Sequence, residues 1–255
     1  MKSKQKREKR RHLSTTEENY LVELLRFLER GIERVKTTEL ANLLEVKPAT
    51  VTNMLDRLKR RKLVKYEKYH GVQLTKKGKI LAAKILRRHR VAERFLVDVL
   101  GMDWAETHKE AHELEHAISD ELLERFEGLI SSIPVCPHGH HIPTKKGEIF
   151  HDCSQPLSDF MEGKEVRISR VSHDLEKDVK TLKKLEGLGL IPGIDVKIKQ
   201  KSPGNGPIML QTGNIKHRRT IAIDNKIASN IYAIPVRIKD LYTVKEASKD
   251  EKMSQ

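Results

Sequence analysis

The stretch PATVTNMLDRLKRRKLVKYEKYHGVQLT, residues 48–75, decides the fold of the first third of the chain. Its first residue, Pro48, suits the start of a helix, where a backbone N–H would have no partner. Two short β-rich runs, LVKYEK and VQLT, follow the helix, and the turn between them ends at Gly71, which is typical of a hairpin. The apolar face of the helix is formed by Val51, Met54, Leu55 and Leu58.

Two more helices are predicted ahead of this stretch. Ser14 and Thr15 each precede a glutamate by three residues, which is the spacing of a capping box at a helix start. The helix ends at Gly31, and a short helix follows with Thr37 as its N-cap. Helix, short helix, tight turn, helix and hairpin in this order predict a winged helix-turn-helix, which places its last helix in the major groove of DNA. The apolar face of the first helix consists of Tyr20, Leu21, Leu24, Leu25 and Leu28.

The charge of the chain agrees with a nucleic-acid partner. The formal net charge is +14 and the pI is about 9.7, which favours binding to a polyanion. Residues 1–100 and 154–255 are basic, whereas residues 101–153 are acidic. A merely basic, solvated surface is the alternative, and the order of the elements favours DNA over it. The candidate DNA contacts are Lys47, Thr50, Thr52, Asn53 and Arg57 on the helix, and Lys65, Lys68 and His70 on the wing.

The rest of the chain predicts an α+β protein. A long helix is expected over residues 76–100 and another from about Trp104 to Phe126. Short β-rich segments separated by Pro, Gly and Asn begin at Glu165, and they predict a small β-barrel interrupted by one helix. The expected domains are a basic tail (1–13), a winged helix-turn-helix (14–75), a helical domain (76–128), a linker (129–164), the β domain (165–243) and a polar tail (244–255).

Several classes of protein are excluded by composition. No apolar run approaches the ~20 residues that span a bilayer, so a membrane is not an expected partner. The basic N-terminal stretch is not followed by the hydrophobic region of a signal peptide. Two cysteines, Cys136 and Cys153, do not make a disulfide framework. The expected compartment is therefore the reducing cytoplasm, and no small-molecule substrate is expected.

The segment HKEAHELEHAISDE contains the candidate metal ligands. Positions four apart on a helix share one face, so His112 and His116 can bind one ion with Glu115 beside them. The preceding helix offers His89 and Glu93 at the same spacing. On residue types alone, a charged helix face in solvent is an equally good interpretation.

Two further interpretations involve metals in other roles. Cys136-x-His138 and His151-x-Cys153 bracket the predicted linker and can hold a structural zinc ion, although one residue between partners is an uncommon spacing. A metallohydrolase would use Glu115 as a general base. Such an enzyme would leave the basic helix without a role, so an enzyme is not expected.

Several stretches together resemble the family of diphtheria-toxin-repressor and manganese-transport-regulator proteins, which are metal-dependent transcriptional repressors. These stretches are TEENYL, PATVTNMLDRLKRRKLV, YEKYHGVQLTKKGK, RRHRVAERFLVDVLGMD, HKEAHELEHAISDE and CPHGHHIP. The likeness extends over nearly the whole chain from residue 14, and the β domain resembles the SH3-like (ferrous-iron-transport-A-like) domain of the longer members. The resemblance implies a cytoplasmic homodimer that binds a palindromic operator when a divalent metal is bound, with residues 76–128 as the metal-binding and dimerisation domain.

The resemblance also implies two metal sites. One residue at the start of the first helix and three from HKEAHELEHAISDE form the primary site, and the second site lies on the two adjacent helices. Cys136 and His138 would lie near the second site. The primary site is Asn19, His112, Glu115 and His116, and the second site is His89, Glu93 and His108.

The primary site departs from the family pattern at two positions. Asn19 stands where Asp or Met is usual, and His112 stands where Cys or Glu is usual. One carboxylate with two imidazoles favours Fe²⁺, with Mn²⁺ second because it prefers oxygen-rich sites, and Zn²⁺ third. Glu18 or Glu23 would add a carboxylate if the helix turned slightly. The alternative function is a winged-helix regulator that senses zinc or a non-metal signal.

Overall fold

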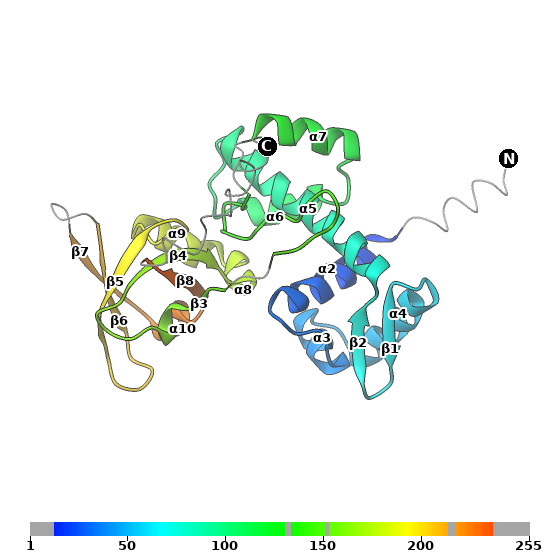
Figure 1. The fold of residues 1–255 in the computed structure, drawn as a ribbon, viewed down its shortest axis with the longest axis horizontal. Helices are drawn as coiled ribbons and strands as arrows, with labels where there is room; N and C mark the ends of the chain where they lie inside the picture. The colour runs from blue at the N-terminus through cyan, green and yellow to red at the C-terminus, as the bar shows by residue number, and fades with distance from the viewer. Residues whose placement is uncertain (1–12, 131–133, 151–152, 214–217, 237–255) are drawn as a thin grey trace, which may run out of the picture. The chain divides into compact units, whose positions relative to one another are not determined.

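The structure is a computed structural model that describes residues 13–130, 134–150, 153–213 and 218–236. The chain forms two compact units, residues 1–152 and residues 153–255 (Figure 1). The predicted polar tail, and the predicted basic tail except for Leu13, lie outside the described residues. Within the described ranges, every helix is too short or too polar to span a bilayer.

The first unit begins with a winged helix-turn-helix, which confirms the prediction. Ser14 starts the first helix as predicted, because its Oγ accepts a hydrogen bond from Glu17 N at 3.2 Å while the Glu17 carboxylate accepts one from Ser14 N at 2.9 Å. This capping box satisfies two backbone donors that a helix start leaves without partners. The elements are α2 (Thr15–Glu29), α3 (Thr37–Leu43), α4 (Pro48–Arg60), β1 (Val64–Glu67) and β2 (Gly71–Leu74).

One hydrophobic core holds these elements together. The predicted apolar faces of α2 and α4 are buried in it, except that Met54 is only partly buried. Each fully buried leucine contributes about 1.5–3 kcal/mol relative to an exposed one. Burial of this face fixes α4 and leaves its opposite face exposed. The largest fully buried side chains of this core are Leu21, Leu25, Leu40, Leu55, Leu58, Leu63, Ile85 and Leu86.

The wing is a tight antiparallel hairpin. β1 pairs with β2 in a register that begins at Val64↔Leu74, and Val35 adds an isolated bridge to Val72. Gly71 has φ +91°, and a Cβ there would lie 2.6 Å from the Val35 carbonyl oxygen. Both the backbone angle and the close approach require glycine at this position.

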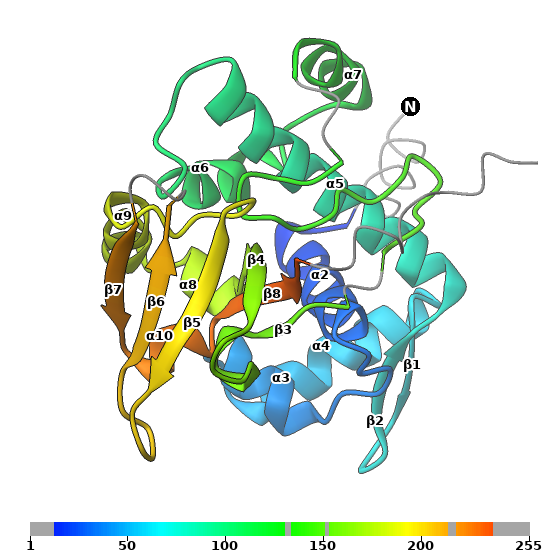
Figure 2. The same cartoon turned by 60° about the vertical axis from the view of Figure 1, so that its left-hand side comes forward.

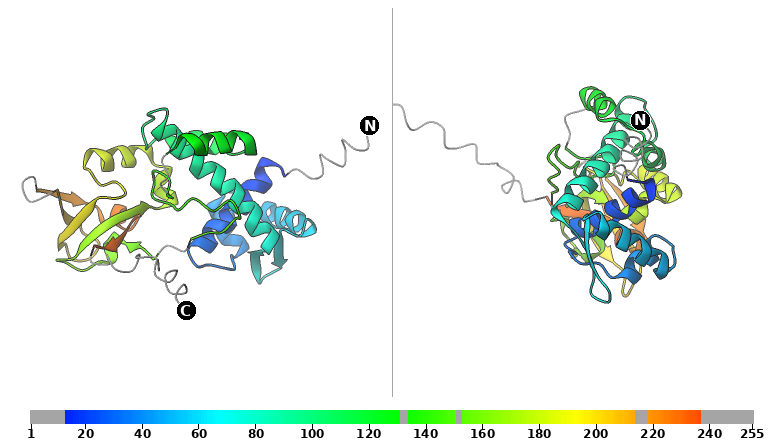
Figure 3. Two further views of the ribbon diagram at one scale, coloured as in Figure 1. Left: turned by 45° about the horizontal axis from the view of Figure 1, so that its top comes forward. Right: turned by 90° about the vertical axis from the view of Figure 1, so that its right-hand side faces the viewer.

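A long helix connects the winged helix to the rest of the first unit. α5 (Lys76–Asp98) is followed by α6 (Thr107–Leu114) and α7 (Asp120–Leu129), and it packs against both (Figures 1 and 3). Thr75 caps α5, because its Oγ1 accepts a hydrogen bond from Gly78 N at 3.0 Å. The same hydroxyl contacts the Leu63 carbonyl oxygen at 3.1 Å, which ties the start of α5 to the base of the wing.

The prediction of a single helix from Trp104 to Phe126 is wrong. The helix is interrupted between α6 and α7, where Ala117 N bonds to Leu114 O, three residues back, at 2.9 Å. Ser119 then adopts an extended conformation, and its side chain accepts a hydrogen bond from Leu122 N, which starts α7 as a new helix. The Ser119 cap is a local signal for a new helix. It was missed because the apolar and acidic residues keep helical spacing across it.

The second unit is a β domain, which confirms the α+β fold class. Its strands form one antiparallel sheet in the order β3-β8-β4-β5-β6-β7, with register shifts in β4 and β5 (Figure 2). β3 and a 3₁₀ turn fall within the predicted linker, since Gln155 and Pro156 pair with β8. The elements are β3 (Gln155–Pro156), η1 (Leu157–Asp159), β4 (Glu165–Val171), α8 (His173–Glu176), α9 (Val179–Gly187), β5 (Asp195–Lys201), β6 (Ile208–Thr212), β7 (Arg219–Ile223), α10 (Asn225–Ala228) and β8 (Ile231–Pro235).

Candidate metal centre

Three helices and a loop of the first unit carry the predicted ligands. Glu18 and Asn19 lie near the start of α2, and His89 and Glu93 lie one helical turn apart on α5. α6 and the turn after it carry His108, His112, Glu115 and His116, and a loop after α7 carries Cys136 and His138. α5 packs against both α2 and α6, so it lies at the centre of the arrangement. The side chains form two groups, which we name the first cluster (Glu18, His112, Glu115 and His116) and the second cluster (His89, Glu93, His108, Cys136 and His138).

The first cluster is organised around the carboxylate of Glu115, which is 1% exposed. Its Oε1 lies 3.2 Å from His112 Nδ1 and 3.1 Å from His116 Nε2. Three of the four residues predicted for the primary site therefore converge, although the helix ends within the motif. His112 remains half exposed on the outer side of the group.

Asn19 is the fourth predicted ligand. The residue before it, Glu18, reaches the cluster with its carboxylate. Glu18 Oε2 lies 2.6 Å from His116 Nδ1. The amide oxygen Oδ1 of Asn19 is buried and has no hydrogen-bond partner among the described residues. From the sequence, Glu18 was predicted to reach the site only if the helix turned slightly, whereas α2 already brings it into contact with His116.

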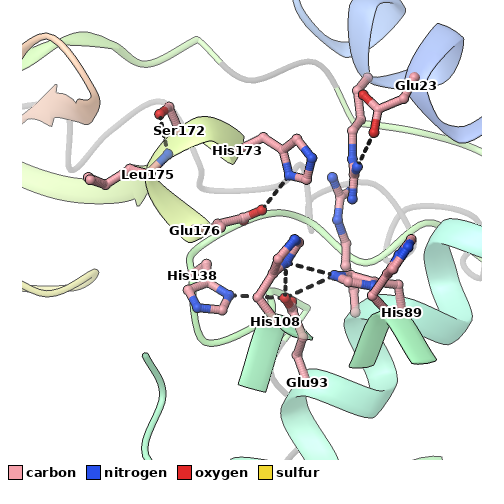
Figure 4. A network of polar contacts seen from close by, with 12 residues as sticks. Glu23, His89, Glu93, His108, His138, Ser172, His173, Leu175 and Glu176 are labelled. Atoms are coloured by element: carbon pink, nitrogen blue, oxygen red, sulfur yellow. Dashed lines mark hydrogen bonds and ion pairs between the residues drawn. The ribbon is translucent and has the colours of Figure 1, made fainter. Parts of the chain in front are cut away.

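The second cluster is organised around a single carboxylate oxygen, Oε1 of Glu93 (Figure 4). This oxygen lies 3.0 Å from His89 Nε2, 3.2 Å from His108 Nδ1 and 3.1 Å from His138 Nδ1. The Cys136 thiol belongs to the same group, because the ligand atoms of Glu93, Cys136 and His138 all lie within 4.8 Å of one another. The three residues predicted for the second site thus lie together, and Cys136 and His138 join them.

A short loop delivers Cys136 and His138 to this position. Gly139, with φ 90°, closes a tight turn in which Cys136 N bonds to His140 O at 2.8 Å. Arg90 fixes the loop on α5 by donating to His141 O at 2.6 Å. Of the other predicted pair, Cys153 is exposed in the second unit, and His151 lies outside the described residues.

His89 links the two clusters, which were predicted to be two separate sites. Its Nε2 faces Glu93, whereas its Nδ1 lies 2.8 Å from Glu115 Oε2. Neither His89 Nδ1 nor Glu115 Oε2 is aligned well enough to form a hydrogen bond, so the contact is electrostatic. A histidine that binds an ion through one ring nitrogen commonly has a carboxylate at the other, which orients the ring.

Mutual attraction holds the buried groups in their charged forms. Burial raises the pKa of Glu93, but the facing His89 and His138 outweigh it and hold that pKa well below its usual range. Burial lowers the pKa of His89, but the carboxylates of Glu93 and Glu115 outweigh it and raise the pKa to about 9. The Glu115 carboxylate raises the pKa of His116. An ion bound here displaces these protons, so its affinity rises with pH.

The donor sets fit divalent transition metals. The first cluster offers two carboxylates and two imidazoles, which is a nitrogen and oxygen set. The second cluster offers three imidazoles, a carboxylate and a thiol. Imidazole and carboxylate together suit Fe²⁺ and Mn²⁺, and a thiol adds affinity for softer ions such as Zn²⁺.

The predicted DNA contacts lie on the outer face of α4 and on the wing. All are exposed except Thr52, which is partly buried and donates from Oγ1 to Pro48 O at 3.1 Å. Arg57 Nε also lies 2.8 Å from the buried carboxylate of Glu17, a partner that the sequence analysis did not name. The winged helix-turn-helix thus has the features expected for DNA binding. α4 has a buried apolar face and an exposed polar face, and the hairpin beside it is basic.

Comparisons with known proteins match three family models along the chain. The model of the iron dependent repressor N-terminal DNA binding domain matches residues 12–72, and that of the iron dependent repressor metal binding and dimerisation domain matches residues 75–144. The FeoA domain matches residues 155–235. These matches leave only short segments of the chain uncovered.

Curated relatives match over most of their length. A diphtheria toxin repressor from Corynebacterium glutamicum is 31% identical over 194 residues, which cover 73% of this chain and 84% of the relative. The iron-dependent repressor IdeR from Mycobacterium tuberculosis is 27% identical over 212 residues, 79% of this chain and 91% of the relative. An HTH-type transcriptional regulator from Methanocaldococcus jannaschii is 46% identical over 115 residues, 45% of this chain and 92% of the relative.

Solved structures of similar proteins share the fold. A manganese-dependent transcriptional repressor in complex with manganese has a TM-score of 0.77 and 26% identity, with 86% of this chain and 100% of that chain covered. ScaR with bound Zn²⁺ has a TM-score of 0.69 and 30% identity, with 86% and 99% covered. IdeR from T. acidophilum has a TM-score of 0.65 and 26% identity, with 88% and 99% covered.

Proposed function

Because this chain belongs to the diphtheria-toxin-repressor family of metal-dependent, DNA-binding transcriptional repressors, we propose that it binds a palindromic operator as a homodimer when loaded with Fe²⁺. Its targets would be genes of metal homeostasis, which places its action at the chromosome in the cytoplasm. The observation that carries the proposal is the convergence of Glu18 on α2 with Glu115 and His116 beyond α6.

The first cluster joins the DNA-binding part of the unit to its helical part. Glu18 and Asn19 lie on the first turn of α2, in the winged helix, whereas His112, Glu115 and His116 follow α5. A divalent cation held by Glu18, Glu115 and His116 would supply the positive charge that offsets the two carboxylates. Side chains from both parts then fix the orientation of α4, and in a dimer they fix the spacing of two such helices, which must match successive major grooves about 34 Å apart. Metal can favour DNA binding only to the extent that it binds the DNA-binding orientation of α4 more tightly than other orientations.

Fe²⁺ is the preferred ion for the first cluster, with Mn²⁺ and Zn²⁺ as alternatives. Two carboxylates and two imidazoles without sulfur suit Fe²⁺, and the Glu18 carboxylate brings the cluster closer to the oxygen-rich sites of Mn²⁺. The similar proteins favour more than one ion. This chain is similar to an iron-dependent repressor, to a repressor in complex with manganese and to a repressor with bound Zn²⁺. We propose the second cluster, which holds the Cys136 thiol, as an ancillary site for the same ion or for Zn²⁺.

The DNA surface proposed here comprises the exposed face of α4 and the wing. Asn53 can bind adenine, Thr50 can contact a thymine methyl group, and Arg57 can bind phosphate or guanine. Lys65 and Lys68 on the wing are exposed and suit backbone phosphates.

The experiment that tests this function is a titration of operator binding against metal. Fluorescence anisotropy of a labelled operator would be measured with the full chain at buffered free Fe²⁺, Mn²⁺, Zn²⁺ and Co²⁺, without oxygen for Fe²⁺. We expect operator binding only in the presence of metal, half-maximal binding at a lower free concentration of Fe²⁺ than of Mn²⁺, and complete release on addition of a chelator. Operator binding that persists in excess chelator would contradict metal dependence and favour a regulator that senses another signal.

Binding at the second cluster is expected to quench tryptophan fluorescence. Trp104 is the only tryptophan of the chain, and its carbonyl oxygen lies 3.0 Å from Nε2 of His138, whose Nδ1 faces Glu93. A paramagnetic ion such as Co²⁺ held by His138 would therefore quench the emission in a saturable way. The quenching should disappear in His138→Ala and persist in the control His70→Ala, an exposed wing residue. Unchanged quenching in His138→Ala would exclude His138 as a ligand.

A further inference from the structure

The first turn of α2 contains a buried carboxylate that the metal clusters do not use. Glu17 is 0% exposed, and apart from the helix cap its partners are two arginines of α4 and its C-cap. Its Oε1 forms an ion pair with Arg57 Nε at 2.8 Å that lacks the alignment of a hydrogen bond, and its Oε2 accepts a hydrogen bond from Arg61 Nη1 at 2.9 Å. Burial of a carboxylate is costly unless it is paired, so these contacts are part of what keeps Glu17 in place.

The two arginines differ in exposure, and the difference indicates their roles. Arg61 is 24% exposed and packs beside Glu17, whereas the Arg57 side chain is 54% exposed on the face of α4 proposed to meet DNA. The guanidinium group is planar and rigid. An ion pair at Nε therefore restricts where the guanidinium lies and leaves the two terminal amino groups, which bind phosphate or guanine in bidentate fashion, for another partner.

We propose that Glu17 is a positioning residue for operator recognition, which holds the exposed Arg57 guanidinium ready for a DNA phosphate or base edge. The inference rests on the proposed function of α4 as the DNA-reading helix. An arginine held in this way before binding loses less conformational freedom when it meets DNA. The neighbouring Glu18 contacts His116, so the turn that positions Arg57 is the turn that carries the metal ligands.

The variant that tests the proposal is Glu17→Gln. Glutamine suits the third position of a capping box as glutamate does, so the helix start is retained while the charge that holds Arg57 is lost. At saturating metal we expect operator affinity to fall by roughly five- to tenfold, which is the cost of ordering one long side chain at an interface. Circular dichroism and the metal titration should remain unchanged.

The matched control is Glu39→Gln. Glu39 holds the corresponding position of α3, where its carboxylate accepts a hydrogen bond from Lys36 N at 2.9 Å, and it is exposed. Removal of a negative charge near DNA strengthens binding in general. The control should therefore bind the operator equally or more tightly, whereas the proposal requires Glu17→Gln to bind more weakly. An equal or tighter affinity of Glu17→Gln would overturn the proposal.

A double-mutant cycle with Arg57→Ala separates positioning from general damage. If Glu17 acts through Arg57, then Glu17→Gln should produce no further loss of operator affinity in the Arg57→Ala background. Additive losses would overturn the proposal. If Arg57→Ala alone leaves operator affinity unchanged, the positioning role fails while metal-dependent binding by the unaltered chain stands, so the two failures are distinguishable.

Discussion

Replacement of Glu115 by glutamine is expected to abolish metal-dependent operator binding. The carboxylate contacts His112, His116 and His89 with its two oxygens, so it is the group through which the first cluster is assembled. The glutamine amide keeps the shape but loses the charge and turns one acceptor into a donor that faces imidazole nitrogens. Changes to groups that only orient metal ligands cost about 10–100-fold in affinity, so loss of a central ligand should cost at least about 100-fold.

The measurement for Glu115→Gln has two parts and a close control. Metal affinity would be measured by competition with a calibrated chelator, and operator binding by anisotropy at a free Fe²⁺ concentration that saturates the unaltered chain. Glu113→Gln makes the same chemical change two residues earlier on α6, at an exposed position, and should behave like the unaltered chain. Metal-dependent binding of normal strength by Glu115→Gln would remove Glu115 from the metal centre.

The winged helix could be predicted from sequence because its signals are local and redundant. Pro48 at a helix start, a capping box at Ser14 and Gly71 in the hairpin each set one boundary, and the apolar periodicity set the buried faces. The single helix expected over residues 104–126 failed for the opposite reason. The Ser119 cap is a weak signal within a segment whose charges and apolar residues keep helical spacing.

The membership of the candidate clusters could be predicted only in part. The spacing of His112, Glu115 and His116 indicated one group, but the approach of Glu18 depends on how α2 packs against α5, which no local pattern encodes. The same holds for the contact between His89 and Glu115, which links two groups that lie apart in the sequence. Contacts between helices depend on how the helices pack around their shared core. Local sequence patterns predict the helices but not this packing.

Replacement of Gly78 by alanine is expected to destabilise the first unit by about 3 kcal/mol, the upper range for a forced steric overlap in a packed site. Alanine normally stabilises a helix interior relative to glycine by roughly 0.5–1 kcal/mol. At Gly78, however, a Cβ would lie 2.0 Å from the Leu63 carbonyl oxygen. That oxygen accepts a hydrogen bond from Thr75 N at 3.0 Å and cannot move away without breaking the junction between the wing and α5.

Gly128, a second glycine within a helix, provides the control for Gly78→Ala. It shows whether the loss of stability comes from the junction between the wing and α5. A Cβ on Gly128 in α7 would meet nothing within 4 Å, so Gly128→Ala should stabilise the unit by up to about 1 kcal/mol. Denaturant unfolding of both variants, followed by the emission of Trp104 in the same unit, should therefore shift the midpoints in opposite directions. Because α5 carries His89 and Glu93 onward from this junction, loss of stability there should also weaken metal binding. Equal stability of the two alanine variants would mean that α5 starts away from the wing, and the close packing of Gly78 on Leu63 would be wrong.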